Sequence, residues 1–207
     1  MPVQVASLVQ QTSFYGADRI HIMERSDSTV LLLADGAGGM SGAKEAAEWI
    51  IQAFTQVVEK HEGPLHLDDL EILVRELDTK LLCERNTGNT TFVAVVIRPN
   101  QIYGVSVGDS RCWHYTEHYQ LELTAQQYRV PFLGTGQAVP VAFGPFASEG
   151  LLLVSSDGLF DELRQPAIDE IVLSSTNVDD IPKRLFARLT PNEKTLSDDI
   201  SIIACQL

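Results

Sequence analysis

Short runs of β-branched residues and leucine, each bounded by Gly, Asp or Asn, constrain the fold of this chain more than any other feature. Such runs are typical of strands buried in a sheet. They span residues 29–34, 91–97, 102–107, 151–155 and 200–205. A turn at residues 98–101 predicts that 91–107 forms a hairpin, and the runs at 111–115 and 119–123 are expected to extend it into a meander.

Two longer segments have the apolar spacing of amphipathic helices. In residues 43–60 the apolar side chains recur with the helical period, and Ser41 stands where it could cap the first turn. Residues 68–82 repeat the pattern, and a third helix is expected over residues 179–189. Because the helices are clustered between runs of strands, the order favours an α+β fold over a doubly wound parallel sheet.

Length and charge limit the classes of function. At 207 residues the chain is expected to form a single domain, residues 1–207, and its 44% hydrophobic content suffices for a core. Its formal net charge of −13 disfavours binding to nucleic acid or to an anionic membrane surface. The cysteines, Cys83, Cys112 and Cys205, are far apart and odd in number. This favours a reducing, cytoplasmic location over a disulfide framework or a zinc cluster.

Acidic residues follow several of the expected strands. Asp35 comes directly after an apolar run, Asp109 and Asp157 each follow an apolar run after one further residue, and all three stand beside a glycine. Asp198 shortly precedes the last run, and Asp18 precedes a short strand expected at 20–23. Each aspartate alone is an ordinary turn former, but the shared context favours a common site. Converging carboxylates repel one another unless a cation neutralises them. Oxygen-rich sites of this kind select hard ions such as Mg²⁺ or Mn²⁺.

Two other motifs suggest alternative functions. The sequence GAGGMS resembles a dinucleotide-binding loop, but Ser41 stands in place of the third glycine, and helix continues where an acid ending a strand should follow. Ser110 lies in a GDS sequence, but Cys112 replaces the closing glycine of a hydrolase elbow. The last histidine is His118, so no histidine follows to complete a Ser–Asp–His order. Both alternatives are therefore disfavoured.

The ordered set of motifs resembles the metal-dependent protein phosphatases of the protein phosphatase 2C (PPM) family. The matching blocks are DGAGGMSGAKEA, GNTT, GDSR, SSDGLFDEL and SDDISII, and they occur in family order from about residue 18 to 203. Each block is weak alone, and the ordered set is specific. The resemblance implies a β-sandwich of two antiparallel sheets flanked by helix pairs, with two metal ions at one end.

The resemblance also implies roles for individual residues. Asp35 would bridge both metals, the Gly36 carbonyl would bind one of them, and Asp157 and Asp198 would complete the other site. Asp18 would hold a metal-bound water without ligating the metal itself.

Further positions match the family pattern more loosely. Asp109 matches the acid that binds a third, weaker metal in bacterial members, and Asp199 is expected to orient other groups rather than ligate. Gly38 and Gly39 would let the backbone turn close to the metals.

The implied chemistry is hydrolysis of a phosphomonoester, namely phosphoserine or phosphothreonine in a protein. Two Mn²⁺ or Mg²⁺ ions would activate a water that attacks phosphorus directly, without a covalent enzyme intermediate. Asp35, Asp157 and Asp198 would be the catalytic residues.

The sequence departs from the family pattern in three places. Ser13 stands where many members have an arginine that grips the substrate phosphate, and Arg19 and Arg111 are candidates to replace it. Ala37 replaces a histidine proposed as general acid in some members, so water would protonate the leaving group. The segment 124–150 is too short for the flap subdomain of larger bacterial members.

The shortened segment resembles the small phosphatases of bacterial stress and sporulation signalling, whose substrates are phosphorylated regulatory proteins. The missing arginine and flap also leave an alternative open. In that alternative the chain is a phosphatase-like signalling or binding module with weak or no turnover.

Overall fold

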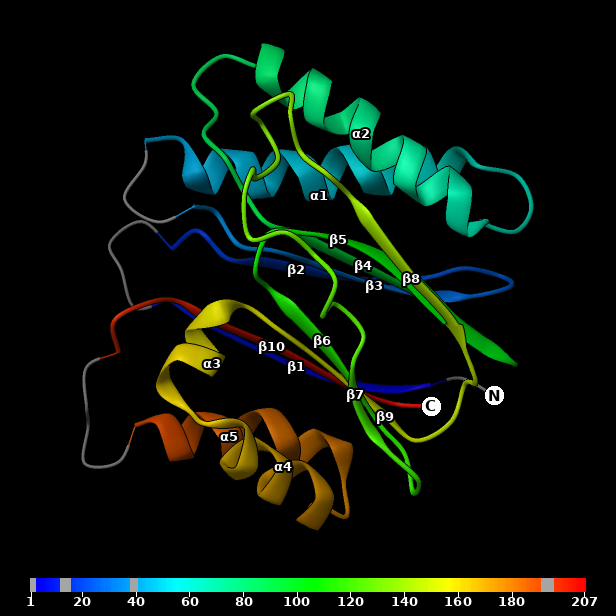
Figure 1. Cartoon of the computed structure of the whole chain (residues 1–207), viewed down its shortest axis with the longest axis vertical. Helices are drawn as coiled ribbons and strands as arrows, with labels where there is room; N and C mark the ends of the chain where they lie inside the picture. The colour runs from blue at the N-terminus through cyan, green and yellow to red at the C-terminus, as the bar shows by residue number, and fades with distance from the viewer. Residues whose placement is uncertain (1–2, 12–15, 38–40, 191–195) are drawn as a thin grey trace.

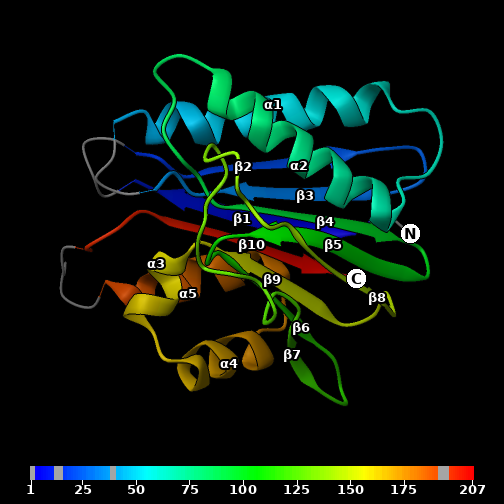
Figure 2. The same ribbon diagram turned by 45° about the horizontal axis from the view of Figure 1, so that its top comes forward.

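Two antiparallel sheets of five strands each pack face to face, and helices cover both outer faces (Figures 1 and 2). This is the architecture of a computed structural model that describes residues 3–11, 16–37, 41–190 and 196–207. The strand orders are β2-β3-β4-β5-β8 and β1-β10-β9-β6-β7. The α+β sandwich expected from the sequence is therefore confirmed.

The first sheet carries the most apolar strands. Its strands are β2 (Arg19–Glu24), β3 (Thr29–Ala34), β4 (Phe92–Arg98), β5 (Gln101–Val107) and β8 (Val141–Phe146). Every residue of β3 is buried, because one face of the strand packs on helices and the other on the second sheet. Val30 and Leu32 lie in the helix-covered cluster, whereas Leu31 and Leu33 lie between the sheets, as the alternation of a strand requires.

The second sheet joins the two ends of the described chain. Its strands are β1 (Gln4–Gln10), β6 (Arg111–Tyr115), β7 (Gln120–Glu122), β9 (Leu151–Ser155) and β10 (Ile200–Gln206). β1 and β10 pair along their whole length, from Gln4 opposite Gln206 to Gln10 opposite Ile200. β9 lies on the other side of β10. Asp157, two residues after β9, and Asp198, two residues before β10, therefore lie at the ends of neighbouring strands.

A pair of long helices covers the first sheet and a group of shorter ones covers the second (Figures 1 and 2). The long pair is α1 (Ala43–Lys60) and α2 (Leu67–Cys83). The shorter group is α3 (Asp157–Glu162), α4 (Gln165–Ser174), the 3-10 turn η1 (Val178–Asp180) and α5 (Ile181–Leu189). Within the described residues, no helix is both long and apolar enough to cross a bilayer.

Two expectations about the local structure are wrong. Ser41 does not cap α1. The cap position is Gly42 in a left-handed conformation (φ 85°), and its carbonyl accepts hydrogen bonds from Ala46 N and Gly88 N. β6 and β7 do not extend the β4–β5 hairpin, because they belong to the other sheet. The chain crosses between the sheets after β5 at Gly108, whose φ of 99° turns the backbone out of the first sheet.

Candidate metal centre

Four aspartates from separate elements meet at one end of the sandwich. Asp35 directly follows β3, Asp157 is the first residue of α3 after β9, Asp198 lies just before β10, and Asp18 lies just before β2. We call these four residues the carboxylate cluster. Burial raises the pKa of Asp35, and the charges of Asp18, Asp157 and Asp198, which lie close to it, raise it further. The structure thus brings together residues that are as much as 180 positions apart.

Asp35 is fixed by the two threonines of the GNTT motif. Its carbonyl accepts a hydrogen bond from Thr91 N (2.8 Å) and one from Thr90 Oγ1 (2.9 Å), and its amide donates to Thr91 Oγ1 (3.1 Å). Thr91 Oγ1 also lies 2.7 Å from the hydroxyl of Ser110 in the GDSR motif. Three of the sequence blocks therefore brace one another around Asp35.

Two glycines allow the backbone to approach closely beside these aspartates. A Cβ on Gly36 would collide with the carbonyl of Ala43 at the start of α1. A Cβ on Gly158 would collide with the carbonyl of Asp199, which leads into β10. Because both contacts are with backbone atoms, a side chain at either position would push Asp35 or Asp157 away from the cluster.

Asp199 supports the cluster through the backbone. It is buried, and its Oδ2 accepts a hydrogen bond from Ala17 N at 2.7 Å, directly before Asp18. This contact ties the segment before β10 to the segment before β2, so Asp199 helps set the position of Asp18.

Asp18 is the most buried member of the cluster, at 1% exposure. Neither of its carboxylate oxygens receives a hydrogen bond of normal geometry from the described residues. Burial raises the pKa of Asp18 to about 6, although the side chains of Asp35, Ser156 and Ser201 approach it closely enough to lower the pKa in part. Asp18 is thus an acceptor whose hydrogen-bonding needs the described protein groups do not meet.

The cluster carries uncompensated negative charge. Burial raises the pKa of Asp35 well above its usual range, and the charges of Asp18, Asp157 and Asp198 raise it further. Burial raises the pKa of Asp157, followed by the charges of Asp109 and Asp198. Burial likewise raises the pKa of Asp198, although this side chain lies at the exposed rim.

Hard divalent cations fit this donor set. Carboxylate oxygens are the ligands that Mg²⁺ and Mn²⁺ favour, and cations would relieve the repulsion among the aspartates. No three of the described His, Cys, Asp and Glu side chains are grouped as ligands of one ion. Mg²⁺ is commonly held by only one or two carboxylates and several waters, so pairs drawn from the cluster suffice.

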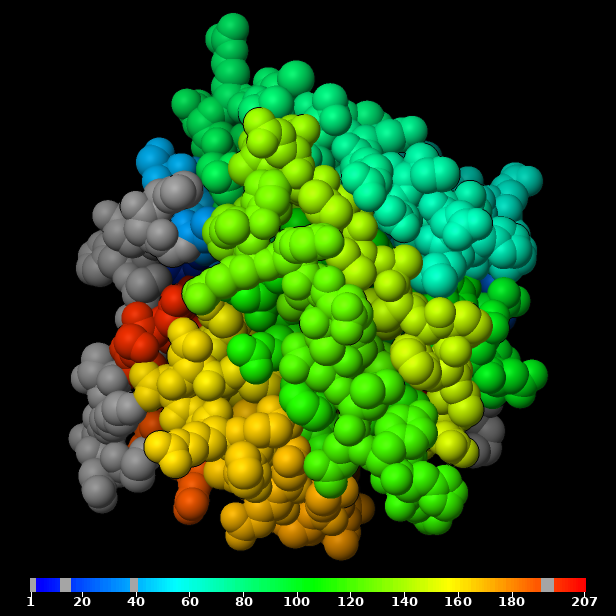
Figure 3. Space-filling model, viewed as in Figure 1, coloured from blue at the N-terminus to red at the C-terminus, as the bar shows by residue number. Residues whose placement is uncertain are grey.

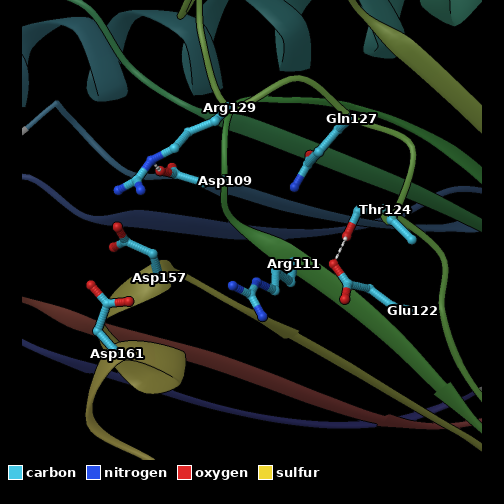
Figure 4. A pocket seen from close by; sticks show the side chains of 10 residues that line it. Asp109, Arg111, Glu122, Thr124, Gln127, Arg129, Asp157 and Asp161 are labelled. Atoms are coloured by element: carbon cyan, nitrogen blue, oxygen red, sulfur yellow. Dashed lines mark hydrogen bonds and ion pairs between the residues drawn. The ribbon is translucent and has the colours of Figure 1, made fainter. Parts of the chain in front are cut away.

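Asp109 lies beside the cluster but has a different partner. Its charge raises the pKa of both Asp157 and Asp198. Its Oδ2, however, lies 2.8 Å from Nε of Arg129, so a protein cation pairs with it in this structure (Figure 4). The third metal expected at Asp109 would have to displace this ion pair.

A pocket of about 340 Å³ opens next to the carboxylate cluster. Figure 3 shows this face of the molecule, where the segment after β7 (yellow-green) lies beside α3 (yellow). Figure 4 shows the lining side chains: Asp109 with Arg129 and Asp157 with Asp161 on one side, Arg111 in the middle, and Glu122 with Thr124 opposite. We call Asp109, Arg111, Gln127 and Arg129 the pocket wall.

The two arginines considered as phosphate ligands are placed differently. The Arg19 guanidinium donates to Glu48 Oε1 (2.5 Å), to Gly16 O (2.8 Å) and to Asp18 O (2.6 Å). It therefore ties the start of β2 to α1 and is committed to that role. Arg111 instead lines the pocket.

Two aspartates were missed by sequence reasoning. Asp161 lines the pocket and raises the pKa of Asp157, and its position four residues after Asp157 in SSDGLFDEL would place both on one helix face. Asp78 is buried on α2 and accepts hydrogen bonds from Gly134 N (2.7 Å), Gly136 N (3.1 Å) and Ala138 N (2.9 Å). The signal for Asp78 was a charge on the apolar face, one residue after Leu77 and four after Val74.

The short segment between β7 and β8 follows the expectation of a missing flap. Residues 123–140 contain neither a helix nor a strand, and Asp78 holds the second half of this segment against α2. Three further positions lie outside the described residues: Ser13, which replaces the family's phosphate-binding arginine, and Gly38 and Gly39, which were expected to let the backbone turn close to the metals.

Comparison with protein families decides the relationship. The family model described as protein phosphatase 2C matches residues 11–132, more than half of the chain. The chain belongs to the protein phosphatase 2C family. The match includes the segments with Asp18, Asp35 and Asp109, whereas Asp157 and Asp198 lie beyond it.

Individual relatives are distant in sequence and close in fold. The serine/threonine phosphatase stp of Listeria monocytogenes is 22% identical over 77% of this chain and 78% of its own. The crystal structure of Stp1 from Staphylococcus aureus has a TM-score of 0.81 at 16% identity, covering 100% of this chain and 96% of that one. The catalytic domain of PstP in complex with two manganese ions has a TM-score of 0.78 at 19% identity, with 99% and 97% covered. These structures share the fold of the present chain.

Proposed function

We propose that this chain is a metal-dependent protein phosphatase that removes phosphate from phosphoserine or phosphothreonine. The observation that carries the proposal is the carboxylate cluster, in which Asp35 is surrounded by the charges of Asp18, Asp157 and Asp198. Such a concentration of negative charge opposes folding unless cations compensate it. Membership of the protein phosphatase 2C family supports the same chemistry.

The proposed ligands are those at the strand ends. Asp35 and the carbonyl of Gly36, together with Asp157 and Asp198, would hold two Mn²⁺ or Mg²⁺ ions, and the manganese bound to PstP supports this choice of metal. When bound, such ions activate water and stabilise negative charge on the phosphoryl oxygens.

The residues of the chain then position the reactants. Thr90 and Thr91 hold the backbone of Asp35, so its carboxylate is fixed before substrate arrives. The buried oxygens of Asp18 offer acceptors to a water beside Asp35 and would orient its lone pair toward phosphorus. Ser110 takes no part as a nucleophile, because it is fully buried with its hydroxyl 2.7 Å from that of Thr91.

The substrate class follows from the relatives, which are named serine/threonine phosphatases. We infer a phosphorylated regulatory protein as the substrate, with residues 1–207 acting as one domain in the cytoplasm. The acidic cluster itself repels a free phosphate dianion, so substrate binding and metal binding should be strongly coupled.

The experiment that tests the proposal measures hydrolysis of an aryl phosphate with Mn²⁺, with Mg²⁺ and with a chelator. Phosphoserine and phosphothreonine peptides should then be hydrolysed faster than a phosphotyrosine peptide. The alternative, a binding module without turnover, is favoured by the absence of an arginine at Ser13. A protein that neither binds Mn²⁺ nor hydrolyses any of these substrates would refute the phosphatase proposal.

A further inference from the structure

The pocket beside the carboxylate cluster contains an arginine that the proposed ligand set does not use. Arg111 lines this pocket together with Asp157, the member of the cluster that the pocket reaches (Figure 4). Arg111 is the first residue of β6 and pairs with Ser155 of β9, two positions before Asp157. The backbones of Arg111 and Asp157 are therefore held at a fixed spacing by sheet hydrogen bonds.

The Arg111 guanidinium is oriented but not neutralised. It lies 4.7 Å from the centre of the Phe160 ring, a stacking that restricts its rotation. Among the described residues it makes neither an ion pair nor a side-chain hydrogen bond. Its N–H donors thus face a polar pocket while remaining available to a ligand.

The other arginines near the cluster are already engaged. Arg19 binds Glu48 and two backbone carbonyls on the side of α1. Arg129 pairs with Asp109, and 75% of its side chain is exposed. A half-buried guanidinium with uncommitted donors is the better anion ligand, because less water and less conformational freedom are lost on binding.

We propose that Arg111 binds the phosphoryl oxygens of the substrate, from across the pocket from Asp157. The inference rests on the proposed phosphatase function and supplies the cationic group that Ser13 does not provide. The planar guanidinium can donate two parallel hydrogen bonds to a phosphate, which a lysine cannot do. The ligand is therefore a phosphate monoester dianion, held between Arg111 and the cations of the cluster.

The test compares Arg111→Ala, Arg111→Lys and the control Arg188→Ala, which removes an exposed arginine of α5 outside the pocket. Binding of inorganic phosphate to the Mg²⁺-loaded protein is measured by calorimetry, and KM, kcat and phosphate inhibition are measured with an aryl phosphate. Mn²⁺ affinity and the melting temperature are measured for every variant.

We expect Arg111→Ala to weaken phosphate binding and inhibition about tenfold or more and to raise KM. Arg111→Lys should recover part of this loss, and Arg188→Ala should match the wild type. Mn²⁺ affinity should change little in all three. Should Arg111→Ala fold poorly, the comparison is made between Arg111→Lys and wild type, where a severalfold weaker phosphate affinity is expected.

Unchanged phosphate affinity in folded Arg111 variants would overturn the inference while leaving the phosphatase proposal intact. A wild-type protein that does not bind phosphate in the presence of Mg²⁺ would also overturn it. Conversely, a wild-type protein that binds phosphate through Arg111 without hydrolysing any ester would refute the phosphatase proposal alone.

Discussion

The carboxylate cluster and the pocket wall lie side by side, yet they handle charge in opposite ways. In the cluster, burial raises the pKa of Asp35, the charges of Asp18, Asp157 and Asp198 raise it further, and no described cation pairs with these aspartates. In the pocket wall, Asp109 is paired with Arg129 at 2.8 Å. The cluster is built on strand ends, whereas half of the wall lies on the irregular segment after β7.

This difference indicates a division of labour. Uncompensated charge on rigid elements costs stability, and is retained where function needs a site prepared for cations. A wall whose acid carries its own counter-ion costs little stability. Changes in the cluster should therefore abolish activity, while changes in the wall should adjust binding.

The largest effect is expected from Asp35→Asn, which removes the central charge of the cluster. Turnover of an aryl phosphate should fall on the order of 10³-fold, as for loss of a major electrostatic stabiliser. The fold should persist, because Asn keeps the shape and the backbone hydrogen bonds to Thr90 and Thr91 remain. Steady-state kinetics measure the loss of turnover, and circular dichroism shows whether the fold persists. An active Asp35→Asn protein would contradict the central role of this residue.

Metal binding should stabilise the wild type and not Asp35→Asn. At a Mn²⁺ concentration about 100 times its Kd, linkage predicts about 2.7 kcal/mol of added stability, or roughly 5–10 °C in Tm. Thermal unfolding with Mn²⁺ and with a chelator gives the shift. An equal shift in Asp35→Asn would place the stabilising metal elsewhere on the molecule.

The pH dependence of stability distinguishes the metal-free cluster from an ordinary carboxylate pair. The folded pKa of Asp18 is raised to about 6 from 3.8, so the folded state binds more protons than the unfolded state between these values. The contribution of Asp18 is therefore fully present below pH 4 and is lost as the pH rises through about 6.

Asp18→Asn should remove most of this dependence and, without metal, raise stability at pH 7.5 by on the order of 2–3 kcal/mol. Urea unfolding of both proteins at pH 5 and pH 7.5 in a chelator measures it. Identical pH profiles for the two proteins would mean that the ionisation of Asp18 does not lower the stability of the folded state.

Asp78 offers a way to disturb the segment between β7 and β8 without touching the cluster. Asp78→Asn replaces two carboxylate oxygens with one amide oxygen and an NH2 group that cannot accept. The substitution should lower the free energy of unfolding by about 1.5–2 kcal/mol, since three backbone N–H groups donate to this side chain. Hydrogen exchange should increase at residues 134–138 and stay unchanged at β3. Faster exchange at both places would indicate that the two regions are not separable.

The smallest effect is expected from Asp109→Asn, which removes the acid of the wall. Hydrolysis of an aryl phosphate should fall less than tenfold, below about 1.4 kcal/mol, because this carboxylate is already paired with Arg129. The same assay as for Asp35→Asn gives the comparison directly. A loss of activity as large as that of Asp35→Asn would show that Asp109 is as important for hydrolysis as the carboxylate cluster.

The sequence predicted the parts of the fold that local pattern determines. The strands at 29–34, 111–115 and 151–155 and the helix at 43–60 have the predicted bounds. The strands at 29–34 and 151–155 are dense apolar runs with clear ends, and the helix has a regular apolar period. β1 was missed, because it is a half-exposed edge strand with glutamines at both ends. β8 was missed since Gly144 and Pro145 interrupt its pattern.

The aspartates of the site were predictable because each one follows or precedes a recognisable strand. This position can be read from the sequence without knowing which segments contact one another. Which sheet β6 joins was not, since strand pairing between distant segments leaves no local trace. The Arg129–Asp109 pair was also beyond prediction, because the segment that carries Arg129 has no periodicity. The roles given to the metal ligands remain predictions.

The full-length pairing of β1 with β10 has a consequence for synthesis of the protein. Asp18 and Asp35 leave the ribosome long before Asp198 and the strand that follows it, because about 160 residues separate Asp35 from Asp198. A nascent or prematurely terminated chain therefore lacks part of the cluster and the partner of its first strand. We therefore expect a chain that stops before residue 198 to lack phosphatase activity.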